Sequence, residues 1–597
     1  MSQGITAVHV THEAIGKIGG IGAVLEGLFT SRAYTDAIGR SILISPLFSI
    51  EGDVSSRLGP GGEVLYSSID GVVNTSYFPG FRKIEEQYNV NIVYGRRTFS
   101  DGQTGVISSP EVILIDVTRI EQRPVNELKG GMFREFGIRS NLYENLWEYE
   151  QYVRLAPPAI AVLKAIGAAE RDSSTVIISH EFMGMPTALA AKLDSTYDFR
   201  TVFYAHEVAP VRLIVEKHSG HDTMFYNTMK QARRIGLSVN EVFGDQTYFF
   251  KYALVDASRY CDTILAVGDN IVEELRFLAP EFSLADIDVS YNGVPAYEIG
   301  LAEKHESKAK LQQNCENLLG YRPDFIFTHV TRLVVSKGLW RDLRVLEHID
   351  SEFEALGARA VLLVLSTEIG NRRKSDIYNM EATYNWPVAH REGMPDLSGG
   401  EAAFYAGVQE FNAKSRNVKV IYINQFGFSR DRCGARMPHD MEFMDIRKGS
   451  DVEFGQSIYE PFGIAQLEPL SFGGICVISN VCGCTGFVKA ASGGAEIRNV
   501  IVADYTNLGN YNWSDLEDLQ QINKEARDHI EHNVSEKVAL EICARLPKND
   551  DESSEMLRTG YELAMHMSWE VVAKDYVVKG LKKTIHKIYD KQVRLRA

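Results

Sequence analysis

Two glutamates, Glu460 and Glu468, lie eight positions apart in the chain, and a Pro-Phe-Gly turn follows the first of them. The proline favours a turn or a helix start, so we expect Glu460 in the preceding loop. The apolar residues from Gly463 onward predict a buried helix with Glu468 one to two turns into it. Two such acids can hold two parts of one polar ligand, for example two sugar rings. The structural alternative is one glutamate that caps a helix and one that is solvated.

A glycine-rich loop follows the first predicted strand, at 5–10. Lys17, Gly19 and Gly20 precede a helix that we expect to begin near Ala23. Glycines let a backbone approach a ligand closely, and the amides at a helix start favour phosphate. Lys17 adds a point charge. The spacing matches neither the dinucleotide fingerprint nor the P-loop, and a tight strand-to-helix turn explains it equally well.

Two cations, Arg332 and Lys337, follow a predicted strand at 324–330 and precede Gly338. Arginine can fork two hydrogen bonds to a diphosphate, and lysine adds a compact charge. Two fixed cations can stabilise a departing diphosphate, as a metal does elsewhere, so we expect no catalytic metal. A solvated surface is the alternative environment for the two side chains.

Two histidines stand at the carboxyl ends of predicted strands. His180 follows the strand at 175–179 and His206 follows the strand at 201–205, and each histidine precedes a glutamate. In open parallel sheets, ligands bind beyond the carboxyl ends of the strands. A structural role is the alternative for each histidine.

Strands and helices alternate along the chain in two series separated by Asn292-Gly293. The first series has a helix at 156–169 and strands at 5–10, 41–45, 175–179, 201–205 and 263–267. The second has a helix at 339–353 and strands at 324–330, 360–365, 418–423 and 474–479. Two alternating series predict two doubly wound α/β domains.

The composition is that of a globular protein of more than one domain. The chain has 597 residues, of which 45% are hydrophobic and 24% charged. Its 63 Lys and Arg residues against 79 Asp and Glu give a net charge of −16. This charge argues against a nucleic-acid partner, whose phosphates would be repelled. The basic tail at 574–596 indicates a solvated helix face or, as the alternative, an anionic-ligand site.

Targeting and redox signals indicate a cytoplasmic protein. No basic segment precedes an apolar run at the N-terminus, and no apolar stretch approaches the ~20 residues of a membrane span. Seven cysteines are an odd number, and Cys482-Gly483-Cys484 fits no standard zinc spacing. We therefore expect free thiols in a reducing compartment.

Seven motifs, in order along the chain, resemble those of glycogen and starch synthases, which are retaining GT-B glycosyltransferases. For example, 17–22 resembles their Lys-Val-Gly-Gly-Leu/Ile loop, and Glu460 with Glu468 resembles their Glu-x7-Glu element. The other motifs are His180–Gly184, Thr201–His206, Tyr291–Val294, Thr331–Gly338 and Ser568–Ala573.

The resemblance implies the GT-B fold, in which two Rossmann-like, doubly wound parallel-sheet domains face a cleft. We expect an acceptor-side domain at 1–295 and a domain that binds the nucleotide sugar at 296–567. The helix at 568–597 is expected to return to the N-terminal domain.

The same resemblance implies roles for the candidate residues. Arg332 and Lys337 hold the donor diphosphate, while Glu460 binds hydroxyls of the transferred sugar. Glu468 accepts ribose hydroxyls, and His206 lines the acceptor side. The expected catalytic residues are Glu460, His206, Arg332 and Lys337. The expected substrate-binding residues are Lys17, Gly19, Gly20, His180, Glu468, Gly483, Thr485 and Gly486.

The implied activity is transfer of a glucosyl unit from a nucleotide-diphosphate glucose, such as UDP-glucose, to a growing α-glucan. A GT-B glycosyltransferase with another donor or acceptor is one alternative, and an inactive scaffold that binds glucan or nucleotide is another. No cofactor, nucleic acid or membrane span is expected. The sequence leaves open the donor base, allosteric control and the oligomeric state, a homo-oligomer included.

The chain departs from the family pattern in several places. Phe182 replaces the tryptophan of the family's His-Glu-Trp motif, and the long segment 384–449 has no counterpart that we can place. This segment could form an acceptor-binding or oligomer surface. The stretches 225–227 and 243–252 resemble the helical insertion of the eukaryotic-type enzymes, which favours that type.

Overall fold

The computed structural model describes residues 4–17, 19–102, 104–169, 174–370, 372–509, 511, 513 and 515–587. The described chain divides into two compact units. The first unit takes its residues from Met1–Val211, Ile235–Gly293 and Trp569–Ala597, and the second from Arg212–Arg234 and Val294–Ser568. The units differ from the expected 1–295 and 296–567 because Arg212–Arg234 belongs to the second unit.

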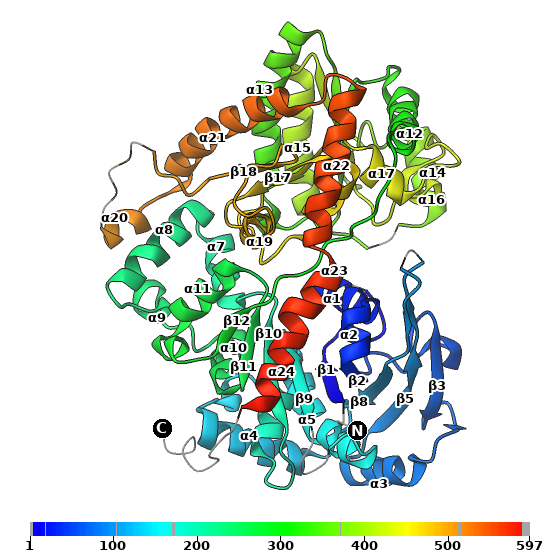
Figure 1. Cartoon of the computed structure of the whole chain (residues 1–597), viewed down its shortest axis with the longest axis vertical. Helices are drawn as coiled ribbons and strands as arrows, with labels where there is room; N and C mark the ends of the chain where they lie inside the picture. The colour runs from blue at the N-terminus through cyan, green and yellow to red at the C-terminus, as the bar shows by residue number, and fades with distance from the viewer. Residues whose placement is uncertain are drawn as a thin grey trace. The chain divides into compact units, whose positions relative to one another are not determined.

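The first unit is built on a ten-stranded sheet (Figure 1). Seven neighbouring strands are parallel, and the last three, β5, β3 and β4, are antiparallel. The order is β12 (Ile287–Val289), β11 (Thr263–Ala266), β10 (Arg200–Ala205), β9 (Thr175–His180), β1 (Ile5–Val10), β2 (Ile38–Pro46), β8 (Glu111–Asp116), β5 (Asn91–Arg97), β3 (Gly62–Ser67) and β4 (Val72–Val73). A separate hairpin pairs β6 (Phe99–Ser100) with β7 (Ile107–Ser108). All five strands predicted in this part of the sequence are confirmed.

The described part of the first unit also contains helices, several of which pack against this sheet. They are α1 (Gly20–Phe29), α2 (Arg32–Ala37), α3 (Phe78–Tyr88), α4 (Gln122–Phe136), α5 (Trp147–Ala165), α6 (Glu181–Leu193), α9 (Val239–Phe243), α10 (Phe250–Asp256), α11 (Asp269–Leu278), α23 (Trp569–Val572) and α24 (Val578–His586). Helix α7 (Ala209–Lys217) crosses the boundary between the units. The helix predicted at 156–169 begins nine residues earlier than expected.

The second unit is built on a six-stranded parallel sheet. Its order is β15 (Val418–Ile423), β14 (Ala360–Leu365), β13 (Phe325–Val330), β16 (Val452–Gly455), β17 (Ile475–Ser479) and β18 (Val500–Ala503). The four strands predicted here are confirmed. The expected helix at 339–353 corresponds to α13 (Trp340–Leu356).

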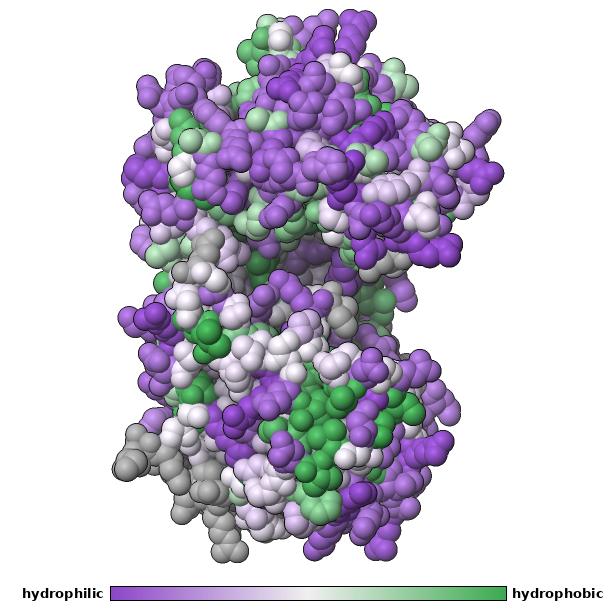
Figure 2. All heavy atoms as spheres, turned by 90° about the vertical axis from the view of Figure 1, so that its right-hand side faces the viewer, coloured by the Kyte–Doolittle hydropathy of each residue, from purple (hydrophilic) through white to green (hydrophobic). Residues whose placement is uncertain are grey.

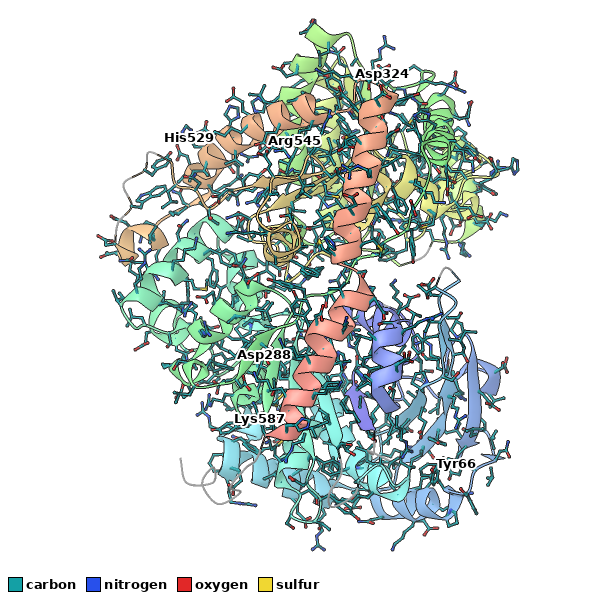
Figure 3. All side chains as sticks on the ribbon, viewed as in Figure 1. Tyr66, Asp288, Asp324, His529, Arg545 and Lys587 are labelled. Carbon is teal, nitrogen blue, oxygen red and sulfur yellow. The ribbon has the colours of Figure 1, made fainter. Side chains whose placement is uncertain are left out.

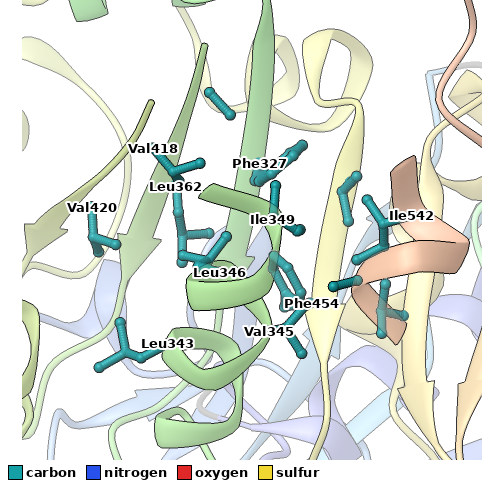
Figure 4. Packing of buried hydrophobic residues seen from close by; sticks show 14 of the residues in the cluster. Phe327, Leu343, Val345, Leu346, Ile349, Leu362, Val418, Val420, Phe454 and Ile542 are labelled. Carbon is teal, nitrogen blue, oxygen red and sulfur yellow. The ribbon is translucent and has the colours of Figure 1, made fainter. Parts of the chain in front are cut away.

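Alternate side chains of the central strands enter two separate cores, which is the pattern of a sheet covered on both faces. Phe327 and Leu362 pack with Leu346 of α13 in one core (Figure 4). Ile326 and Val361 join the other core. The other helices of this unit are α8 (His221–Arg234), α12 (Leu301–Leu319), α14 (Lys374–Tyr384), α15 (Gly399–Lys414), α16 (Arg430–Cys433), α17 (Phe443–Gly449), α18 (Ile464–Leu467), α19 (Cys484–Ala491), α20 (Leu516–Gln520), α21 (Lys524–Arg545) and α22 (Asp550–His566).

The C-terminal segment returns to the first unit, where α24 packs on β10 and β11 (Figure 1). Trp569 lies against two glycines: a Cβ on Gly27 would stand 2.1 Å from its ring, and one on Gly293 would stand 2.5 Å away. Glu570 accepts hydrogen bonds from Ser31 Oγ (2.7 Å) and Ala33 N (2.8 Å). The absent side chains of the glycines therefore make room for the tryptophan.

The basic tail pairs with acidic residues of the same unit. Lys583 contacts Asp286 at 2.6 Å and Asp288 at 2.8 Å, and Lys587 also pairs with Asp286. Figure 3 labels Lys587 and Asp288 at this end of α24. These two lysines serve structural ion pairs, and the tail residues 588–596 lie outside the described residues.

The face of the molecule in Figure 2 is mostly hydrophilic, and apolar side chains gather in a patch on its first unit. No helix in the described part of the chain combines the length and the apolar character that a membrane crossing needs. All seven cysteines are free thiols, and six of them are buried.

Candidate functional site

Lys337 and Glu460 meet because β13 and β16 are neighbouring parallel strands whose carboxyl ends share one sheet edge. Lys337 lies in the loop after β13 and Glu460 in the loop after β16. The two side chains form an ion pair and are only 15% and 13% exposed. A backbone hydrogen bond from Ile458 N to Ser336 O (2.8 Å) ties the loops together.

The turn after Glu460 depends on two glycines. Gly463 has φ +97°, a left-handed conformation that favours glycine. A Cβ on Gly483 would stand 1.8 Å from the carbonyl oxygen of Pro461, so any side chain there would displace the turn. Gly483 follows β17, the next strand of the sheet, so three adjacent strand ends build this region.

The amides expected to approach phosphate have partners inside the chain. Gly483 N–H donates to Glu460 O (3.0 Å), Cys484 N–H to Phe462 O (2.9 Å) and Thr485 N–H to Cys482 O (3.0 Å). A phosphate could use these amides only by displacing those carbonyls. Gly486 lies in the first turn of α19.

The side chain of Arg332 differs from that of Lys337 in its surroundings. It is exposed, and within the described part of the chain no hydrogen bond or ion pair engages it. An exposed guanidinium beside a strand end is available to an anion without the loss of an internal partner.

Glu468 is held by a residue that the sequence did not single out. Arg447 of α17 is 2% exposed and contacts Glu468 at 2.6 Å and the buried Glu453 at 3.1 Å. Glu468 keeps 25% exposure. Its expected place on a helix wall is wrong: α18 ends at Leu467, and Glu468 begins a 3₁₀ segment, Glu468–Phe472, with Pro469 in its first turn.

In the first unit, the carboxylate of Glu13 organises the glycine loop. It accepts hydrogen bonds from Gly19 N (2.7 Å) and Gly22 N (3.0 Å) at the start of α1. The Glu13 carboxylate thus accepts hydrogen bonds from amides at the helix start, where we expected a phosphate to bind. Gly20 faces open space, because a Cβ there would meet no atom within 4 Å.

Lys17 of the same loop forms a 3.0 Å pair with Glu26. Both side chains are more than half exposed, so the pair contributes little to stability. It can therefore exchange its partner for a ligand at small cost. Ile18, the next residue of the motif, lies outside the described residues.

The two predicted histidines belong to one hydrogen-bonded chain. His206 Nε2 lies 2.9 Å from His180 Nδ1, and His180 Nε2 lies 2.8 Å from His9 Nδ1. His9 Nε2 in turn lies 2.6 Å from the hydroxyl of Tyr34. Both ring nitrogens of the buried His180 are engaged, so a substrate could bind them only by displacing His9 or His206.

The strand register explains this alignment. In the pairing of β1 with β9, His9 faces Ile178, and in the pairing of β9 with β10, His180 faces Tyr204. Each histidine therefore stands two positions further along its strand than the one before it. Steps of two keep side chains on one face of a sheet.

Glu181, next to His180, has a left-handed backbone with φ +58°, which is rare outside glycine. It is 4% exposed and accepts a hydrogen bond from the backbone N–H of Glu207. Burial, followed by the nearby Glu207, raises the pKa of the Glu181 carboxyl well above its ordinary value. Backbone strain and a shifted pKa both cluster at functional sites, which makes Glu181 a candidate site residue.

Sequence reasoning missed the residues that support the site. Glu13 could have been found as the only carboxylate next to the glycine loop, and His9 as a polar residue inside an apolar strand. Arg447 gave no signal, because an isolated arginine beside Lys448 looks like a surface residue. Among the described residues, no group of three or more His, Cys, Asp or Glu side chains is placed to hold a metal.

No protein-family model matches the chain, and no curated protein matches it either. Solved structures do. Trehalose-6-phosphate synthase from E. coli, bound with UDP-2-fluoro glucose, is 12% identical with a TM-score of 0.50 over 98% of this chain and 99% of that one. The catalytic domain of Starch Synthase IV from Arabidopsis thaliana, bound to ADP and acarbose, is 15% identical with a TM-score of 0.50 over 98% of this chain and 100% of that one.

Both of these structures are GT-B glycosyltransferases. The likeness extends over nearly the whole chain, and at this level of identity it concerns the fold. The chain has the GT-B fold, with two α/β units built on parallel-dominated sheets, which confirms the predicted fold class.

Proposed function

We propose that this protein is a retaining glycosyltransferase that moves a glucosyl unit from a nucleotide-diphosphate glucose to a growing α-glucan, as glycogen synthases do. The observation that carries the proposal is the Lys337–Glu460 pair at the carboxyl ends of two adjacent parallel strands. This is the edge at which parallel sheets bind ligands. The pair combines a phosphate-binding cation with a sugar-binding carboxylate.

In the proposed reaction, Arg332 and Lys337 bind the donor diphosphate. The diphosphate displaces Glu460 from Lys337, and the freed carboxylate accepts hydrogen bonds from the sugar hydroxyls. Glu468, oriented by Arg447, accepts the ribose hydroxyls. Gly483, Thr485 and Gly486 line the phosphate and sugar side.

The bond between the anomeric carbon and the phosphate oxygen breaks, and the acceptor hydroxyl oxygen bonds to that carbon on the same face. The acceptor proton passes to the departing phosphate oxygen. The two cations stabilise the charge that develops on the diphosphate. His206 contributes a hydrogen bond to an oxygen of the sugar.

A sugar phosphate is the second candidate acceptor. One similar structure is a trehalose-6-phosphate synthase, so the fold hosts enzymes other than glucan synthases. An inactive scaffold is the third candidate. The presence of Glu460, Lys337 and Arg332 together favours the active enzymes over it.

A donor and acceptor panel tests the proposal. The full chain is mixed with UDP-, ADP- or GDP-glucose and with glycogen, glucose 6-phosphate, fructose 6-phosphate or no acceptor, and release of the nucleoside diphosphate is recorded. We expect release that glycogen stimulates. If a sugar phosphate stimulates release and glycogen does not, the acceptor is a sugar phosphate rather than a glucan. No release from any donor would contradict the proposal.

The proposed reaction assigns no role to a metal ion, because two side-chain cations neutralise the diphosphate. Addition of excess EDTA is therefore expected to leave the rate of nucleotide release unchanged. A loss of activity that Mg²⁺ or Mn²⁺ restores would contradict this part of the account.

A further inference from the structure

A chain of hydrogen bonds runs from Tyr34 through His9 and His180 to His206. The three imidazole rings in it are neutral. Burial lowers the pKa of His9 and of His206 to about 3 and lowers the pKa of His180 well below its ordinary value. A neutral imidazole carries one N–H donor and one acceptor nitrogen. Each ring can therefore donate to only one of its two neighbours.

This restriction makes all the hydrogen bonds of the chain point the same way. If Tyr34 donates to His9, then His9 donates to His180, His180 donates to Nε2 of His206, and the proton of His206 lies on Nδ1. If the direction is reversed, His206 donates from Nε2 and its Nδ1 is an acceptor. The tautomer of His206 is thus set by the direction of the hydrogen bond between Tyr34 and His9.

The chemistry of Tyr34 selects the first direction. A phenol O–H is a stronger donor than an imidazole N–H, and an imidazole nitrogen is a stronger acceptor than a phenol oxygen. Burial also raises the pKa of Tyr34, so the phenol keeps its proton. The 2.6 Å bond between its hydroxyl and His9 Nε2 is therefore a donation by Tyr34.

The open end of the chain is Nδ1 of His206. His206 is only partly buried, and within the described residues no partner engages this nitrogen. Its ring lies flat on that of His180, with an angle of 8° between the planes and 5.1 Å between the centroids. The ring orientation is thus fixed, and one nitrogen remains for a ligand.

We propose that Tyr34, His9 and His180 are positioning residues that hold His206 as the Nδ1–H tautomer, so that it donates a hydrogen bond to an oxygen of the bound sugar. This inference rests on the proposed function for the identity of the ligand. The state of His206 itself does not depend on that function.

The direct test is NMR of the full-length protein labelled with ¹⁵N in its histidine rings. The His206 signals are assigned by their loss in His206→Gln. We expect Nδ1 to carry the proton in the wild-type protein. In Tyr34→Phe, which keeps the aromatic ring and removes the hydroxyl, we expect the proton to move to Nε2 in part or entirely. A wild-type Nε2–H tautomer, or an unchanged tautomer in Tyr34→Phe, would overturn the proposal.

Kinetics test the functional consequence. Tyr34→Phe is expected to lower kcat by about fivefold to tenfold, the value of one hydrogen bond, with KM for the donor unchanged. Tyr204→Phe is the matched control, since the Tyr204 ring stacks on His206 with centroids 4.5 Å apart and its hydroxyl is outside the chain. Equal losses in both variants would overturn the proposal. If the wild-type protein shows no turnover, the proposed function fails, and the spectra still decide the tautomer.

Discussion

Glu181 is the residue whose local structure is least favourable in isolation. Its left-handed backbone costs of the order of 1 kcal/mol or more for a residue with a side chain, and its carboxyl group is removed from water. The carboxyl accepts a hydrogen bond from the backbone N–H of Glu207, the residue after His206. The strain is thus coupled to the position of the proposed acceptor-side histidine.

Glu181 also predicts a pH dependence. The raised pKa means that the folded state binds this proton more tightly than the unfolded state, so the contribution of Glu181 to stability falls as pH rises above about 4.3, the ordinary glutamate value. Glu181→Gln, which cannot ionise, is expected to gain stability relative to the wild type between pH 5 and pH 8. Denaturant unfolding at a series of pH values measures the difference.

The matched control is Glu127→Gln, because Glu127 is 66% exposed and pairs with the exposed Arg123. Its unfolding free energy should follow the wild-type pH profile. A constant difference between Glu181→Gln and wild type across the pH range would show that Glu181 is ionised in the folded protein.

At this scale the sequence predicted which charged residues would stand at strand ends, because the Glu-x7-Glu, Arg-x4-Lys and strand-end histidine patterns are local. It could not predict their partners. Glu468 meets Arg447 only after α17 has folded against the 3₁₀ segment, and His180 meets His9 across strands 171 residues apart. Such contacts are set by sheet order.

Among the elements, the segment at Trp569 shows how glycines fix the C-terminal helices on the first unit. The tryptophan fills space that Gly27 of α1 and Gly293 leave free. A methyl group at Gly27 would stand 2.1 Å from the ring, too close for the packing to persist unchanged.

Gly27→Ala is therefore expected to destabilise the protein by about 1–3 kcal/mol through overpacking. Thermal unfolding measures the loss. Gly130→Ala in α4 is the control, since a Cβ there would meet only the flexible end of Arg134 at 3.2 Å. Unfolding midpoints that move equally in the two variants would contradict the account of the tryptophan site.

The nine predicted strands are confirmed, because buried parallel strands are continuous apolar runs bounded by turns. Other strands, among them β5, β8 and β16, were not predicted. Helix limits were predicted less well. Pro157 and Pro158 lie inside α5, so a start near them was a reasonable but wrong expectation. The helix that follows Gly463, α18, has four residues. It ends there because Pro469 in the next turn lacks the N–H that a longer helix needs.

On the scale of the whole molecule, helix α8 is the segment whose place the sequence did not reveal. It lies between β10 and β11 in the chain, yet it packs within the second unit. Its Asp222 and the Glu531 of α21 both contact Arg341, and all three side chains are fully buried. Thr223 adds a hydrogen bond to Tyr505 O (2.8 Å).

Arg341→Met is expected to destabilise the second unit by about 3–5 kcal/mol, because the buried Asp222 loses its counter-ion. Glu531 loses its 2.9 Å contact with Arg341 and keeps Arg344 at 3.5 Å and Arg527 at 3.6 Å. Burial already raises the pKa of Asp222, with Arg341 opposing that rise. The control Arg416→Met removes an exposed pair with Glu354 and should cost about 1 kcal/mol or less. Calorimetric unfolding of both variants gives the comparison, and equal effects would contradict the role of Arg341.

The central claim is that Lys337 and Glu460 act on a nucleotide sugar rather than serve the fold. The most direct measurement is nucleoside-diphosphate release by wild type, Lys337→Met and Glu460→Gln, with the unfolding temperature of each. Lys489→Met, on α19 outside the pair, is the control. We predict losses of about 10²–10³-fold in kcat for the two site variants with little change in stability. Wild-type rates in either site variant, or losses explained by unfolding, would contradict the account.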